Sequence, residues 1–203
     1  MYNWAVNHWE EIVEIFGMIS GLVYIFLEIK AKLLMWPVGI VTSAFFIIVF
    51  FTSKFYADMS LQIYYLVISI YGWIYWYKGN KNSQTKKLPV TKISKKTALI
   101  LLAITFILFL IMSFVLKQYT DSPIPYWDSF TTALSITATW MLAKKIIEQW
   151  LIWIIVDLVS MALYIYKHLY PTAFLFLVFT ILAFVGYFEW KKQINKNQVV
   201  NKT

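Results

Sequence analysis

The 203-residue sequence contains no cysteine and no arginine, and only 14% of its residues are charged. The lack of cysteine excludes disulfides, thiolate metal sites and cysteine nucleophiles. Its two histidines, His8 and His168, lie too far apart in the sequence to predict a metal site. No P-loop, Gly-x-Ser-x-Gly motif or dinucleotide fingerprint is present, so the sequence predicts no ATP-driven pump, no enzyme and no cofactor.

Apolar residues dominate instead: 61% are hydrophobic, 20% are aromatic, and the mean hydropathy is +0.66. A soluble domain carries about 45–50% apolar residues, and one core could not hold this excess. Seven runs approach the roughly 20 apolar residues that a transmembrane helix needs. These runs cover residues 12–29, 34–52, 56–77, 97–116, 127–143, 147–166 and 170–190. The sequence therefore predicts an all-α membrane protein with seven transmembrane helices, without a cleaved signal peptide.

The lysines predict the orientation of these helices. The N-terminus and the connections after the second, fourth and sixth helices carry 3 lysines, against 15 on the other side. The positive-inside rule places the N-terminus outside and the C-terminus in the cytoplasm. The net charge of +8 then reflects orientation in the bilayer, and no nucleic-acid partner is expected. Tryptophans at the span ends are expected in interfacial belts: Trp9, Trp36, Trp76, Trp127, Trp150 and Trp190.

The chain also repeats itself after 114 residues. This shift aligns Trp36 with Trp150, Tyr56 with Tyr170, Gly72 with Gly186, Trp76 with Trp190, Lys30 with Lys144 and Lys78 with Lys192. We expect a single membrane domain, 1–203, with a first repeat over about 10–78, a linker loop and helix over 79–118, and a second repeat over about 126–192. Such a 3+1+3 arrangement of parallel repeats is one transporter architecture. The two glycines are expected to permit close helix approach, and residues 78–96 to form a solvated, flexible loop without a site.

Asp157 is the most informative polar residue within a predicted span. Spacings of three and seven residues place Trp150 and Trp153 on its helix face. Indole rings beside a carboxylate suit a flat, cationic, hydrogen-bonding ligand. The alternative is that the tryptophans are belt residues and that Asp157 pairs with a neighbouring helix.

Two further helices carry polar faces. Gln62 shares a face with Tyr65 and Ser69, and its amide suits ribose hydroxyls or a carboxamide, or else an interhelical hydrogen bond. Asp128 and Thr132 lie four residues apart on a helix face that also holds Thr131 and Ser135. This face is expected to bind the ligand, or else Asp128 is only the N-cap of its helix. Glu28 and Glu148 lie beside lysines and are expected at the membrane interface.

These residues lie in segments that resemble the PnuC family of bacterial vitamin transporters. The matching segments are Trp36-Pro-Val-Gly-Ile, then Phe55-Tyr-Ala-Asp58-Met-Ser-Leu-Gln62 with Tyr71-Gly-Trp73, and Glu148-Gln-Trp150-Leu-Ile-Trp153-Ile-Ile-Val-Asp157 with Tyr164-Ile-Tyr166-Lys167. The resemblance covers almost the whole chain and implies a SWEET-like fold. It implies substrate-binding roles for Trp150, Trp153, Asp157 and Gln62. We include Trp36, Asp128 and Thr132 in the predicted substrate-binding set.

The resemblance also implies facilitated diffusion across the bacterial cytoplasmic (inner) membrane, without energy input. A cytoplasmic kinase would then trap the small-molecule vitamin by phosphorylation. Nicotinamide riboside is the first expectation and thiamine the second, since both are cations that stack on tryptophan; riboflavin follows. A membrane-embedded enzyme and a structural or receptor-like protein are the rival classes. The lipid bilayer is the expected surrounding, and formation of a homo-oligomer stays open.

Overall fold

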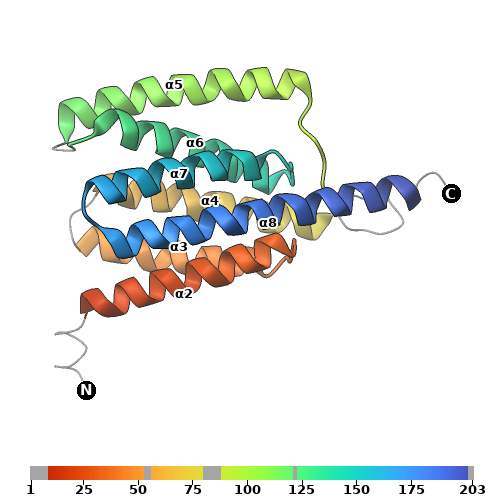
Figure 1. The fold of residues 1–203 in the computed structure, drawn as a ribbon, viewed down its shortest axis with the longest axis horizontal. Coiled ribbons are helices and arrows are strands. Elements are labelled where there is room, and N and C mark those ends of the chain that lie inside the picture. Colours follow the sequence, from red (N-terminus) through yellow and green to blue (C-terminus); the bar gives the residue numbers. More distant parts are fainter. Residues whose placement is uncertain (1–8, 53–55, 80–87, 121–122, 201–203) are drawn as a thin grey trace. The chain divides into compact units, whose positions relative to one another are not determined.

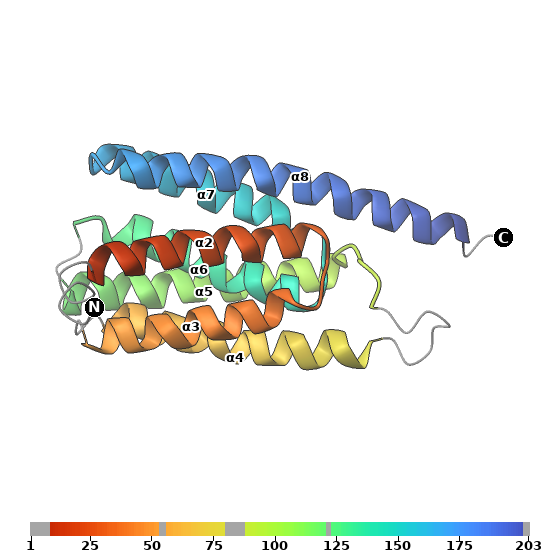
Figure 2. The ribbon, with the colours of Figure 1, turned by 90° about the horizontal axis from the view of Figure 1, so that it is seen from below.

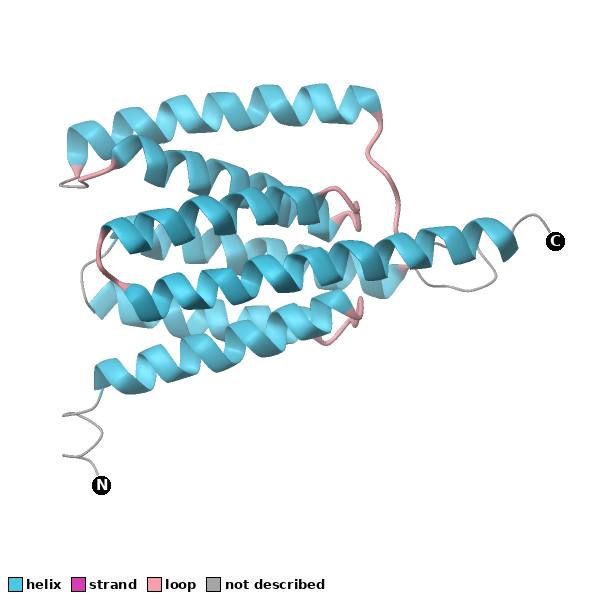
Figure 3. Cartoon of the chain, in the orientation of Figure 1, coloured by secondary structure: helices cyan, strands magenta, loops and turns pink. Residues whose placement is uncertain are grey.

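The computed structural model describes residues 9–52, 56–79, 88–120 and 123–200, and these ranges form seven helices (Figures 1 and 3). In chain order they are α2 (Trp9–Ile29), α3 (Met35–Thr52), α4 (Tyr56–Lys78), α5 (Lys95–Tyr119), α6 (Pro125–Ala143), α7 (Gln149–Tyr166) and α8 (Tyr170–Val200). The predicted all-α fold with seven helices is confirmed. Apolar runs define the helices because a bilayer requires each spanning segment to satisfy its own backbone polar groups.

Four of the described helices are long and apolar enough to cross a membrane: α3, α5, α7 and the Tyr170–Lys196 part of α8. Helix α2 contains a shorter apolar stretch, Ile15–Ile29. Helices α4 and α6 are less apolar because tyrosines, serines and threonines interrupt their apolar residues. Helix α6 alone buries four hydroxyl side chains, those of Ser129, Ser135, Thr137 and Thr139.

The chain divides into two compact units, Met1–Tyr77 and Lys78–Thr203, and each is described by itself. The first unit contains α2, α3 and α4, and the second contains α5 to α8. Within the second unit α7 and α8 lie side by side in both views of the ribbon (Figures 1 and 2). Helix α5 joins α6 through a 2.6 Å hydrogen bond between the hydroxyls of Thr105 and Thr137. The linker helix is therefore a member of the second unit.

The 114-residue repeat reappears in the backbone of the two connections α2–α3 and α6–α7. Ala31 and Lys145 both have positive φ, at 48° and 59°. The N–H of each donates over 2.8 Å to the carbonyl three residues back, Glu28 and Leu142 respectively. In each loop the next N–H donates over 2.9 Å to the carbonyl five residues back. Both helices therefore end in the same Schellman motif.

Each repeat contains a triplet of helices, α2–α4 in the first and α6–α8 in the second, and paired tryptophans fill the interior of each triplet. Trp36 meets Trp76 edge-on, with ring centroids 5.4 Å apart, and Trp150 meets Trp190 in the same way at 5.7 Å. All four side chains are buried, so their predicted place in a lipid-facing belt is wrong. Trp9 and Trp127, by contrast, are exposed.

The glycines on the neighbouring helices explain how these rings fit. A Cβ atom on Gly72 would fall within 3.0 Å of the Trp36 ring, and one on Gly186 would lie 2.5 Å from the Trp150 ring. Side chains larger than hydrogen are excluded at both positions. The predicted close helix approach at the two glycines is confirmed.

Part of the long linker is fixed to the second unit. Thr91 forms a parallel bridge with the α6–α7 connection: its N–H donates to the Lys145 carbonyl over 3.0 Å, and its carbonyl accepts from the Ile147 N–H over 2.9 Å. The buried Lys145 ammonium donates to the Leu88 carbonyl over 2.8 Å. We call residues 88–93 the linker strap. For these residues the predicted flexible loop is wrong, while residues 80–87 lie outside the described ranges.

Two further contacts hold the end of the linker strap. The Glu148 carboxylate accepts a 2.9 Å hydrogen bond from the Ile93 N–H. The Ile93 side chain packs against the buried cluster of Leu101, Met141 and Ile146. Ser94 then caps α5 by accepting a hydrogen bond from the Thr97 N–H over 3.1 Å. Glu148 is therefore a bonding partner of the strap and not simply an interfacial charge.

Candidate functional site

Helix α7 directs its three predicted site residues toward the interior. The exposed fractions of Trp150 and Asp157 are 1% and 5%, and Trp153 is half-buried. The opposite face carries Leu151, Ile155 and Leu158, which are each more than 40% exposed. The common face predicted from the three- and seven-residue spacings is thus the inward face of the helix.

The Asp157 carboxylate is buried without a hydrogen bond or ion pair from any of the residues that the structure describes. An uncompensated buried charge is strongly unfavourable, and more so at membrane depth. A positively charged group or hydroxyl donors placed beside Asp157 would remove this penalty. The helix therefore holds a carboxylate suited to a cationic or hydroxyl-bearing molecule.

Groups of complementary chemistry flank Asp157 on the same face. The Trp153 indole N–H, one turn earlier, is buried and has no hydrogen-bond acceptor among the described residues. Ser160, one turn later, is also buried. The face offers a donor, a carboxylate and a hydroxyl, beside an aromatic ring. Ser160 was missed by the sequence reasoning, although its three-residue distance from Asp157 would have identified it.

Trp150 occupies a different environment from Trp153. Its ring packs against Gly186 and edge-on against Trp190, so α8 encloses it. Its indole N–H is buried and has no acceptor within the described ranges. The ring therefore fixes α7 against α8, one turn from Trp153. Its predicted contact with substrate stays a prediction.

Helix α6 places Asp128 differently from the expected cap. Ile124 is the N-cap residue and Pro125 is the first helical residue, so Asp128 lies inside the first turn. The expectation of an Asp128 N-cap is wrong, because proline, which needs no N–H partner, starts the helix earlier. The Thr132 hydroxyl donates to the Asp128 carbonyl over 2.7 Å. Such bonds let α6 carry hydroxyl groups in an apolar medium.

In the first unit three helices converge beside the polar face of α4. Gln62 and Tyr65 are half-buried, and Ser69 is buried on the same face. A Cβ atom on Gly39 of α3 would lie 3.0 Å from both the Ser69 hydroxyl oxygen and the Tyr24 ring of α2. Gly39 thus makes room for an aromatic ring and a hydroxyl. Trp36 lies at Gly72, about 15 Å along α4 from Gln62, so the structure does not bring these two predicted residues together.

Glu28 is 4% exposed, so its carboxylate is buried against the protein, and its interfacial position stays a prediction. It lies one turn after Tyr24 and interacts electrostatically with that side chain. The lysines at positions 30 and 32 suggested a solvated end, but the helix still faces the interior at residue 28. The four-residue spacing from Tyr24 within an apolar run was the available signal.

The repeats share their packing but not their chemistry. The 114-residue shift relates Trp153 to Gly39 and Asp157 to Ser43, which is also buried. The acid and the second tryptophan are therefore specific to the second repeat.

Comparisons with known proteins agree with this architecture. The model of the nicotinamide mononucleotide transporter family matches residues 11–192. The nicotinamide riboside transporter PnuC of Escherichia coli is 25% identical over 201 residues, covering 88% of this chain and 84% of its own length. The riboflavin/roseoflavin transporter RibM of Streptomyces davaonensis is 24% identical over 187 residues, covering 90% and 84%. The crystal structure of the vitamin B3 transporter PnuC has the same fold, with a TM-score of 0.74 at 18% identity, covering 96% of this chain and 87% of that one.

Proposed function

Because the chain belongs to the nicotinamide mononucleotide transporter family, we propose that this multi-pass membrane transporter carries nicotinamide riboside into the bacterial cell. Uptake proceeds by facilitated diffusion, and a cytoplasmic kinase traps the vitamin by phosphorylation. Alternating access follows from movement of the two parallel repeats. The rival function as an enzyme is excluded by the family.

The buried Asp157 carboxylate beside Trp153 is the observation that carries this proposal. The pyridinium ring of nicotinamide riboside neutralises the carboxylate and stacks on the indole, a cation–π contact worth about 2 kcal/mol when desolvated. The ribose hydroxyls and the carboxamide meet polar groups such as Ser160 and Gln62. Trp150, Trp36, Asp128 and Thr132 complete the proposed substrate-binding set.

Thiamine is the second candidate, because its thiazolium ring is also a cation and matches the same carboxylate. Riboflavin is neutral, so only its hydroxyl groups could compensate the buried carboxylate, and it ranks third. The relative that carries riboflavin therefore does not determine the substrate of this chain.

Calorimetric titration of the purified protein with all three vitamins tests the substrate. We expect nicotinamide riboside to bind most tightly and Asp157→Asn to weaken it at least tenfold, about 1.4 kcal/mol. The control is Glu189→Gln, which removes an acid of the same charge that pairs with Lys192 over 2.9 Å. If thiamine binds more tightly than nicotinamide riboside, thiamine is the substrate. An unchanged affinity of the Asp157→Asn variant would refute the role of the carboxylate.

The proposed orientation places the N-terminus outside and the C-terminus in the cytoplasm. Since the chain has no cysteine, single cysteines at Lys117 and Lys196 give unambiguous labels. A membrane-impermeant thiol reagent applied to intact cells should label Lys117→Cys and not Lys196→Cys. The reverse labelling pattern would show that the C-terminus faces the outside and would refute the proposed orientation.

A further inference from the structure

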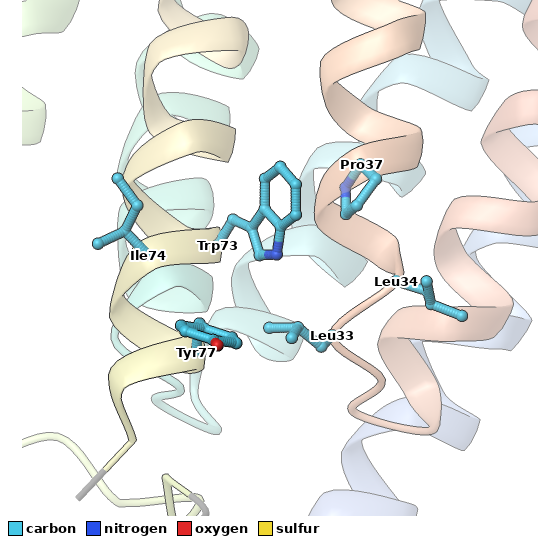
Figure 4. A pocket seen from close by; sticks show the side chains of 6 residues that line it. All are labelled: Leu33, Leu34, Pro37, Trp73, Ile74 and Tyr77. Atoms are coloured by element: carbon cyan, nitrogen blue, oxygen red, sulfur yellow. The ribbon is translucent and has the colours of Figure 1, made fainter. Parts of the chain in front are cut away.

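The first unit contains an apolar groove between the start of α3 and the last turns of α4 (Figure 4). Its volume is about 480 Å³, and its lining residues are Leu33, Leu34, Pro37, Trp73, Ile74 and Tyr77. Leu34 and Tyr77 are 66% and 77% exposed, so the groove opens to the surroundings of the protein. The groove is therefore an open apolar surface of the first unit.

Exposed lysines adjoin both walls of the groove. Lys32 directly precedes Leu33, Lys30 lies two residues earlier, and Lys78 directly follows Tyr77. Tryptophan, tyrosine and lysine are the residues that mark the membrane interface. The groove is thus apolar along the helices and positively charged at their ends.

The corresponding residues of the second repeat differ in chemistry and in contacts. The 114-residue shift relates Leu33, Leu34 and Tyr77 to Ile147, Glu148 and Lys191. Ile147 is buried, and the linker strap bonds to Ile147 and Glu148. The linker strap therefore bonds to the start of α7 in the second repeat, whereas the groove of the first repeat is open among the residues that the structure describes.

We propose that the groove binds an anionic phospholipid. One acyl chain lies along Leu34, Pro37, Trp73 and Ile74, and the phosphate faces Lys30, Lys32 and Lys78. The apolar walls alone would not select one lipid, because the bilayer offers acyl chains everywhere. The lysines supply the selection, since each basic residue near the surface strengthens binding of anionic lipid roughly fivefold.

Native mass spectrometry of the purified full chain tests the proposal without any vitamin present. The probes are phosphatidylglycerol and phosphatidylcholine with identical acyl chains. We expect the wild-type protein to retain one phosphatidylglycerol in preference to phosphatidylcholine. Lys30→Gln with Lys78→Gln should lower this retention roughly 25-fold, because each of the two lysines contributes a factor of about five.

The matched control removes the two repeat-related charges, by Lys144→Gln with Lys192→Gln, and should keep the wild-type retention. Leu34→Glu introduces the glutamate that the second repeat has at the equivalent position, Glu148. This substitution should abolish lipid binding, while the helix content measured by circular dichroism should stay unchanged. Water-soluble glycerol phosphate should not compete, because it lacks the acyl chain. Equal loss in both double variants, equal retention of the two lipids, or a lipid-free dimer that forms through this face would overturn the proposal.

Discussion

Replacing Gly186 with alanine adds one methyl group at the place where α8 meets Trp150. The new Cβ atom would lie 2.5 Å from Cη2 and Cζ2 of the indole ring. Optimal carbon–carbon contact is about 3.5–4.0 Å, so the ring and the helix must separate by about 1 Å. The ring has no free direction, because it is buried and its centroid lies 5.7 Å from that of Trp190. Helix α7 or α8 must therefore move.

Overpacking of this kind costs roughly 1–3 kcal/mol. We expect Gly186→Ala to lower the free energy of unfolding by that amount, measured by reversible unfolding in mixed micelles. Trp150→Phe shortens the ring that the methyl group meets and should compensate for it. The free energy of unfolding of the double variant should exceed, by at least about 1 kcal/mol, the value expected if the two single effects simply added.

The repeat supplies an internal replicate. Gly72→Ala with Trp36→Phe should show the same coupling, because Gly72 and Trp36 have the same geometry. Gly17→Ala is the milder control, since its Cβ would meet only the edge of the Phe46 ring at 2.9 Å. Strictly additive single effects at Gly186 and Trp150 would refute the explanation that the glycine exists to receive the indole.

Two other substitutions test the loops. Ala31→Gly should raise the free energy of unfolding by about 1 kcal/mol, because Ala31 has a φ of 48°, which favours glycine; unchanged or lower stability would contradict the backbone assignment. Lys145→Met keeps the aliphatic stem but removes the ammonium that bonds the Leu88 carbonyl, and should cost roughly 1–3 kcal/mol. Hydrogen exchange at the amides of Thr91 and Ile147 should then accelerate, and unchanged protection would show that the strap does not depend on the lysine.

The positions of the helices were predictable because apolar runs and helix ends coincide in a bilayer. The exception is the last helix, predicted to end at residue 190 but continuing to Val200. Its apolar run does end there, yet Lys191, Lys192 and Gln193 are good helix formers, and Lys192 bonds Glu189 one turn back over 2.9 Å. Hydropathy reports the limit of the membrane and not the limit of the helix.

The inward face of α7 was predictable from residue spacing, but the surroundings of single side chains were not. Tryptophan serves both as an interfacial anchor and as a core residue, and the sequence around Trp36 or Trp150 is compatible with both. The deciding partner is a glycine on the next helix, which periodicity within one helix cannot reveal. The linker strap was misjudged for the same reason, since it is held by residues 145–148, which are distant in the sequence.

The duplicated loops and tryptophan pairs give the two triplets of helices the same packing. Their polar residues differ, with Asp157 and Trp153 in one half and Ser43 and Gly39 in the other. A chain with two identical halves would present two equal acids to its cargo. This chain has the scaffold twice and the acid once, so saturation should require a single vitamin molecule per polypeptide.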